Sequence, residues 1–145
     1  MNPVDKVKIT DLFQELRKAV NILHQLRRTP EEAFLASFEK IGSARYFFIV
    51  AIESAIDICN HIIAAQRLGQ PKEYAEVFRV MGEAGIFPPD FVQELEEMAR
   101  FRNLLVHVYA RVDDRRVYEL LETRLSDFER FESGIREYLA KIGDE

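Results

Sequence analysis

Cysteine, tryptophan, glycine and proline are all scarce in this chain of 145 residues. With a single cysteine, Cys59, no disulfide can form within the chain, and a reducing cytoplasm is the compartment that fits best. Six glycines and five prolines are too few for a collagen-like or low-complexity chain. Because 48% of the residues are hydrophobic and 31% are charged, we expect one globular domain over residues 1–145.

Long apolar runs are also missing. A membrane span needs roughly 18 consecutive apolar residues, and the longest apolar stretch, residues 47–65, is interrupted by Glu53, Asp57, Asn60 and His61. The N-terminal residues carry charges where a signal peptide would have an apolar core. We therefore expect no membrane association.

A strongly basic charge is absent as well. The net charge of −5 argues against a protein that coats long nucleic acid through its overall field. Residues 100–116, however, contain five arginines and two aspartates, a local surplus of three positive charges. Such a segment could hold a short phosphate-bearing ligand. The alternative is a set of solvated arginines at a helix end, which the helix dipole favours.

The periodicity of apolar residues predicts helices along the whole chain and no strands. We expect long helices at about 4–28, 44–68, 89–109 and 116–142 and a short one at about 72–82, with a capping box at 29–32 and a break at 42–43. The predicted fold is an all-α, up-down antiparallel bundle of four long helices and one short one.

The third long helix carries the most unusual segment, residues 99–109. Its core-facing side is predicted to contain Phe91, Leu95, Met98, Leu105 and Val106. Arg102 and Tyr109 fall on that same face. Because arginine is rarely buried without a partner, Arg102 must be satisfied by an acidic side chain, a carbonyl or a bound anion.

His107 is predicted to point away from the core, because it lies about 140° around the helix from Arg102. Phe101, Leu104 and Val108 crowd the same outer side. A helix that is apolar nearly all round is covered on both sides. Another element of the chain could cover it, but a second copy would do so equally well, so we expect dimerisation through this helix.

A polar stripe runs along the second long helix, where Glu53, Asp57 and Asn60 share one edge with His61 beside them. Asp57 and His61 have the spacing of two metal ligands, but a structural site needs about four and no third candidate is at ligand spacing. We therefore expect no metal. We expect instead that a carboxylate of this stripe pairs with Arg102 or His107 of a neighbouring helix.

No glycine-rich phosphate loop, nucleophile elbow or zinc spacing is present. What remains is Arg102, Asn103, His107 and Tyr109. A histidine can move a proton near neutral pH, and an arginine can stabilise charge on phosphate oxygens. Together they could cleave RNA without a metal, by helping a ribose 2′-hydroxyl attack the adjacent phosphate.

Residues 102–109, RNLLVHVY, resemble the Arg-x4-His-x-Tyr signature of the HepT branch of the HEPN superfamily, which contains toxins of toxin–antitoxin pairs. Residues 51–63, 74–78 and 98–102 resemble the family's other blocks in the same order. The resemblance implies a homodimeric, metal-independent ribonuclease without a cofactor, whose composite site pairs the Arg and His of both protomers.

By that resemblance, Arg102 would bind the scissile phosphate, His107 would act as general acid/base, and Asn103 would orient the phosphate or the imidazole. Tyr109 matches the tyrosine that an MntA-like nucleotidyltransferase antitoxin modifies with AMP. Two alternatives stay open. One is a non-catalytic helical module that binds nucleotide, RNA or a nucleotidyltransferase. The other is a dimeric scaffold in which Arg102 is a buried ion-pair partner of Asp57 or Glu53.

Overall fold

The computed structural model describes residues 3–143, which form helices and no strand. The four long helices are α1 (Lys6–Arg27), α3 (Phe38–Gln66), α5 (Pro89–His107) and α7 (Ser126–Gly143). The shorter ones are α2 (Glu31–Leu35), α4 (Tyr74–Glu83), the one-turn 3₁₀ helix η1 (Tyr109–Arg111) and α6 (Asp114–Thr123). The predicted all-α bundle is confirmed, although the described residues contain more short helices than expected.

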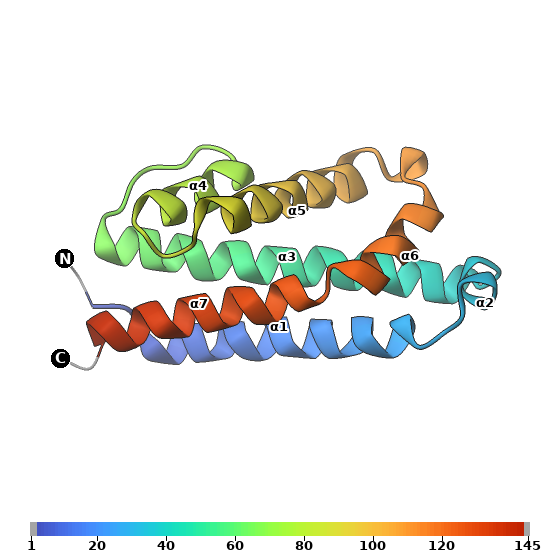
Figure 1. The fold of residues 1–145 in the computed structure, drawn as a ribbon, viewed down its shortest axis with the longest axis horizontal. Coiled ribbons are helices and arrows are strands. Elements are labelled where there is room, and N and C mark those ends of the chain that lie inside the picture. The colour runs from blue at the N-terminus through green and yellow to red at the C-terminus, as the bar shows by residue number, and fades with distance from the viewer. Residues whose placement is uncertain (1–2, 144–145) are drawn as a thin grey trace.

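Helix α3 lies at the centre of the bundle. It packs against α1 on one side and against α4 and α5 on the other, with α6 near its amino end. Helix α7 runs beside α1, and both ends of the described chain lie at the same end of the bundle (Figure 1). This arrangement places α5 along α3 on the side of the molecule opposite α1 and α7 (Figure 1).

The predicted break at residues 42–43 is wrong, because α3 continues without interruption from Phe38 to Gln66. Ser37 starts it instead, accepting a hydrogen bond from the Lys40 amide at 3.1 Å. A glycine inside a helix costs only about 1 kcal/mol, which packing against α1 readily offsets. The predicted capping box at 29–32 is also not formed, since Pro30 is the N-cap of α2 and no side chain caps it.

The predicted single final helix is in fact two helices, α6 and α7, which are separated at Arg124 and Leu125. On α6, the ring of Tyr118 packs 5.1 Å from that of Phe34 in α2, and its hydroxyl donates to the Thr29 carbonyl at 2.6 Å. Helix α7 instead runs along α1. The break lets one apolar stretch pack against both partners, which a straight helix could not do.

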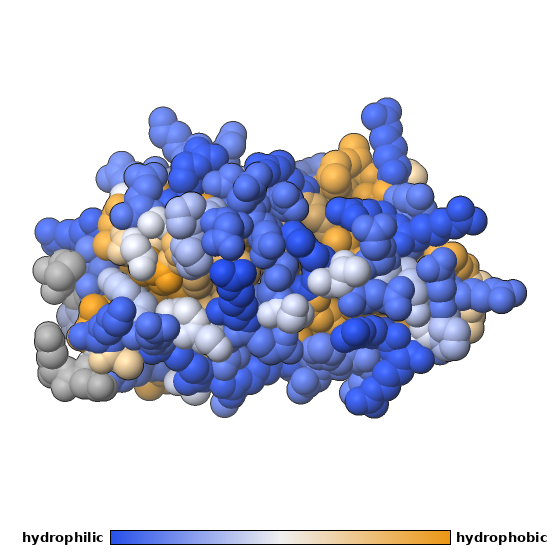
Figure 2. Space-filling model, viewed as in Figure 1, coloured by the Kyte–Doolittle hydropathy of each residue, from blue (hydrophilic) through white to orange (hydrophobic). Residues whose placement is uncertain are grey.

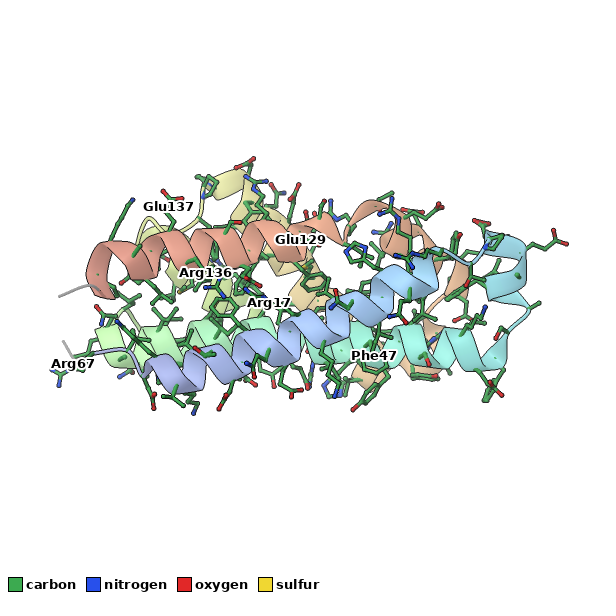
Figure 3. All side chains as sticks on the ribbon, turned by 90° about the horizontal axis from the view of Figure 1, so that it is seen from below. Arg17, Phe47, Arg67, Glu129, Arg136 and Glu137 are labelled. Atoms are coloured by element: carbon green, nitrogen blue, oxygen red, sulfur yellow. The ribbon has the colours of Figure 1, made fainter. Side chains whose placement is uncertain are left out.

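Helices α1 and α7 are joined by a cluster of charges around Glu132 of α7. Arg17 of α1 donates from Nε to Glu132 at 3.0 Å, and Arg136 donates to the same carboxylate at 2.9 Å. Figure 3 shows both arginines between the two helices. These hydrogen bonds lower the pKa of Glu132 below its usual value, the bond from Arg17 being the largest cause.

By length and composition alone, α3 could cross a membrane, contrary to the expectation from its interrupted apolar run. The core helix of a bundle meets the same criterion, and 56% of the most apolar window of α3 is buried inside this structure. The criterion is therefore weak evidence for a span here.

Candidate functional site

Arg102 lies in the middle of α5, with only 12% of its side chain exposed. Its Nε and Nη2 atoms both donate to Oε2 of Glu53 on α3, at 3.0 and 2.5 Å. Its Nη1 atom donates to Oδ1 of Asn103 at 3.1 Å. The Tyr74 ring of α4 covers the guanidinium, with its centroid 4.7 Å from Cζ. Three helices therefore fix the position of this side chain.

The prediction that Arg102 needs an acidic partner from the polar stripe is confirmed for Glu53. Asp57, the other acidic candidate, lies at the surface one turn further along α3, and no ion pair joins it to Arg102. Partial desolvation, together with the charge of Glu53, raises the pKa of Asp57. The ring of His61 on α3 accepts a hydrogen bond from the backbone amide of Asp5 at 3.0 Å. This bond ties His61 to the start of α1 and not to Arg102.

His107 is the last residue of α5 and is exposed, as the sequence predicts. No described residue hydrogen-bonds its ring. Helical geometry places it about 7.5 Å along the axis and about 140° around it from Arg102. Arg102 is turned inward onto Glu53 and Tyr74. Within one chain, therefore, the arginine and the histidine face different sides of the helix.

Tyr109 is not on α5, contrary to the prediction. The helix ends at His107, where Val108 leaves the helical conformation with φ −130° and ψ 43°, and Tyr109 begins η1. Tyr109 is 53% exposed. Its ring packs against Arg45 of α3, whose Cζ lies 4.3 Å from the ring centroid. This contact links α3 to the turn that follows α5.

Arg45 was missed by the sequence analysis. It is only 5% exposed and donates to the carbonyls of Tyr109 and Val112 at 2.7 Å each. It also donates to Oδ1 of Asp114 from Nε at 3.0 Å and from Nη2 at 2.6 Å. Its helical spacing could have predicted its burial, because Arg45 lies three and seven residues before Phe48 and Ile52, on the buried face of α3.

Three exposed apolar side chains lie on the last turn of α5 or directly after it: Leu104, Val106 and Tyr109, and we call this end of the helix the motif surface. Leu104 and Val106 are about 200° apart around the helix, so they flank His107 on different sides. Val106 was expected inside but is 41% exposed, whereas Leu105 is buried as expected. Figure 2 shows apolar atoms over this end of α5 and further apolar areas elsewhere on the same, mostly hydrophilic face.

Among the residues that the structure describes, no group of three or more His, Cys, Asp or Glu side chains is placed to hold a metal ion. The chemistry available around α5 is therefore that of a fixed guanidinium, an exposed imidazole, an amide and an exposed phenol.

Two HepT nucleases are similar in sequence to this chain. The chain is 23% identical to the tRNA nuclease HepT of Aphanizomenon flos-aquae over 145 residues, which cover all of this chain and 99% of that protein. It is 32% identical to the mRNA nuclease HepT of Shewanella oneidensis over 79 residues, which cover 54% of this chain and 59% of that protein.

Among solved structures, the tri-AMPylated Shewanella oneidensis HEPN toxin in complex with MNT antitoxin superposes with a TM-score of 0.83 at 24% identity. The match covers 94% of this chain and 99% of that one. A sequence profile described as Ribonuclease HepT-like matches residues 16–135. The chain therefore belongs to the HepT-like ribonuclease family, as the Arg-x4-His-x-Tyr motif predicted.

Proposed function

We propose that this protein is a metal-independent endoribonuclease toxin. The ribose 2′-oxygen attacks the adjacent phosphorus while the bond to the 5′-oxygen breaks, leaving a 2′,3′-cyclic phosphate and a 5′-hydroxyl end. His107 takes the 2′-hydroxyl proton, and the leaving 5′-oxygen takes a proton from the His107 of the second protomer or from water. The observation that carries the proposal is the fixed, charged Arg102 on the same helix as an exposed His107.

The hydrogen bonds of Arg102 leave donors for a phosphate. Guanidinium has five N–H groups, of which two go to Glu53 and one goes to Asn103. One N–H on each Nη atom has no acceptor among the described residues, and two such donors fit a bidentate phosphate contact. In this proposal, Glu53 and Asn103 orient Arg102, while Asp57 supports the site from the adjacent surface.

A second copy of the chain completes this proposed site. Arg102 and His107 face different sides of α5, so a single chain does not direct both at one phosphate. The motif surface carries exposed apolar side chains on both sides of His107, which suits an isologous contact around a twofold axis. Such a dimer would bring the Arg and His of both protomers together.

The proposed partner is an MntA-like nucleotidyltransferase antitoxin that adds AMP to Tyr109. Support comes from the exposed position of Tyr109 and from the tri-AMPylated toxin and MNT antitoxin of the Shewanella complex. We place the pair in the cytoplasm, where the single cysteine, Cys59, would stay reduced. The whole of residues 1–145 would form one such toxin domain.

The test is to incubate purified protein with total RNA in EDTA, because the two curated relatives are named for different RNA classes. We expect cleavage to 2′,3′-cyclic phosphate ends. His107→Ala should lose about 10²–10⁴-fold in rate, and Arg102→Ala should also be inactive, while Arg100→Ala on the same helix should cut normally. Cleavage that needs Mg²⁺, or a His107→Ala loss below tenfold, would contradict the mechanism, and binding without cleavage would favour the non-catalytic module.

A further inference from the structure

A single buried side chain, Arg45, fixes the segment that follows α5. Four hydrogen bonds run from its guanidinium to two carbonyls, of Tyr109 and Val112, and to the carboxylate of Asp114. In addition to these hydrogen bonds, the Tyr109 ring lies against the face of the same guanidinium. Both the backbone and the ring of Tyr109 are thus held from α3.

The contact with Arg45 covers part of the Tyr109 side chain and leaves the rest exposed to solvent. The residue stays 53% exposed, and no described residue hydrogen-bonds its hydroxyl. A tyrosine that serves only to close a bundle usually places its hydroxyl on a carbonyl, as Tyr118 does with Thr29. Tyr109 instead has an anchored ring and a free hydroxyl, which is what an acceptor of a transferred group requires.

We propose that Arg45, together with Asp114, is the positioning residue for modification of Tyr109. It holds the phenol in one orientation at the surface, so that the partner enzyme meets a preformed acceptor and not a mobile turn. This inference rests on the proposed modification of Tyr109 and adds the residues that control its rate. Arg45 would touch neither the RNA nor the nucleotide.

The chemistry of the transfer explains why orientation matters. The phenolic oxygen of Tyr109 attacks the α-phosphorus of a nucleoside triphosphate held by the partner. A phosphorus–oxygen bond forms to the tyrosine, the bond to the bridging α–β oxygen breaks, pyrophosphate leaves, and the phenolic proton passes to solvent. Such an in-line displacement depends on the angle and distance of the attacking oxygen, so a displacement of about 1 Å can reduce the rate about 100-fold.

Only arginine can make this set of contacts. Its planar fork donates in several directions at once and stacks on a ring, whereas a lysine ammonium at the same place is a point charge. The two carbonyls are those of Tyr109, the first residue of η1, and of Val112, which follows its last residue. Arg45→Lys therefore keeps the positive charge but loses the set of hydrogen bonds that holds the turn after α5.

The experiment measures AMP transfer to Tyr109 by intact mass, with the full-length chain, its nucleotidyltransferase partner and saturating ATP. The variants are Arg45→Lys and the milder Asp114→Asn, which keeps an acceptor for Arg45. The matched control is Arg17→Lys, which changes the pair with Glu132 between α1 and α7, on the other side of the bundle. Thermal midpoints set a temperature at which every variant is folded, and RNA cleavage by the unmodified proteins is measured in parallel.

We expect kcat for transfer to fall roughly ten- to a hundred-fold in Arg45→Lys and less in Asp114→Asn, with KM for the toxin within about threefold of the parent. RNA cleavage should stay close to that of the parent, because His107 lies within α5, and Arg17→Lys should behave as the parent does. Equal transfer kcat in Arg45→Lys and the parent overturns the inference. Transfer and cleavage that fall by the same factor also overturn it, since Arg45 would then be only structural. If the parent itself accepts no AMP at Tyr109, the proposed modification fails and the inference fails with it.

Discussion

Arg102 of α5 donates two hydrogen bonds to a single carboxylate oxygen, Oε2 of Glu53 on α3. Arg102 is the more buried partner, with 12% of its side chain exposed against 39% for Glu53. The carboxylate thus compensates a charge that water reaches poorly, and it also sets the direction in which the remaining donors of Arg102 point.

Glu53→Ala should therefore affect both stability and activity. We expect the free energy of unfolding to fall by about 1–3 kcal/mol, because a mostly buried guanidinium loses its acceptor. RNA cleavage should fall by about tenfold or more as Arg102 loses its orientation. Glu53→Gln, which keeps an amide oxygen, should be milder in both respects. Urea titration and initial cleavage rates measure the two effects.

The control for this pair is Glu119→Ala, which removes the partner of Arg116 in an exposed ion pair. Exposed pairs contribute about 0–1 kcal/mol, so this variant should be nearly neutral. A Glu53→Ala protein that cleaves RNA as fast as the parent would show that Glu53 does not orient Arg102 for the reaction.

Much of the fold follows from the sequence, because apolar residues at helical spacing must share a buried face. The inward positions of Phe91, Leu95, Met98 and Leu105 and the outward position of His107 were predictable in this way. The acidic partner of Arg102 was predictable because a buried charge has few ways to be satisfied. These inferences depend on local periodicity or on the free-energy cost of burying a charge without a partner.

The errors arise where distant contacts decide the local structure. Residues 42–43 look like a break locally, but packing against α1 carries α3 through them. The turn that follows α5 is bonded to Arg45, which is 64 residues from Tyr109 in sequence. No periodicity within 99–109 contains that information. Pairing Arg45 with the turn would have required knowledge of how α3 and α5 align.

Leu104 lies on the motif surface with 50% of its area exposed, so it offers a test of dimerisation. We expect the parent to have twice the chain mass of 16.9 kDa in light scattering, and Leu104→Glu to shift towards the monomer because a charge would be buried in the interface. Val7→Glu is the matched control, since Val7 is an exposed apolar residue on α1 and 73% exposed. It should remain dimeric.

Subunit mixing tests whether the dimer shares its site. When parent protein is exchanged with excess His107→Ala subunits, cleavage per parent chain should fall, because each mixed dimer lacks one histidine. Unchanged activity per parent chain, or a parent that is monomeric at tens of micromolar, would contradict the composite site.

The lowered pKa of Glu132 predicts how the free energy of unfolding depends on pH. Hydrogen bonds from Arg17 and then Arg136 lower the pKa of Glu132 in the folded chain, although partial burial opposes them. A lowered carboxyl pKa contributes stability that is fully present above the unfolded value of about 4.3 and is lost as the pH falls through the folded value. Glu132→Gln should therefore be less stable than the parent at pH 7, by about 1–2 kcal/mol.

Thermal or urea unfolding at pH 7, 5 and 3 checks this expectation. The difference between Glu132→Gln and the parent should shrink as the pH falls below about 4. Glu137→Gln is the control, because its contact with Lys141 is exposed and 3.9 Å long. A gap that stays the same at pH 3 would mean that the charge of Glu132 is not its cause.

Tyr109 is the proposed point at which the toxin is silenced. An AMP group on its oxygen would add a phosphate anion and a nucleoside at the rim of the motif surface, beside His107, where RNA and the second copy are proposed to meet. Tyr109→Phe keeps the ring against Arg45 but has no oxygen to modify, so it should cleave RNA at the parent's rate and escape silencing by the partner and ATP. Tyr46→Phe removes another exposed tyrosine hydroxyl, one residue after Arg45, and should still be silenced with a mass increase of one or more AMP units. If the partner silences Tyr109→Phe as completely as the parent, inhibition works by masking the site, and Tyr109 is not the switch.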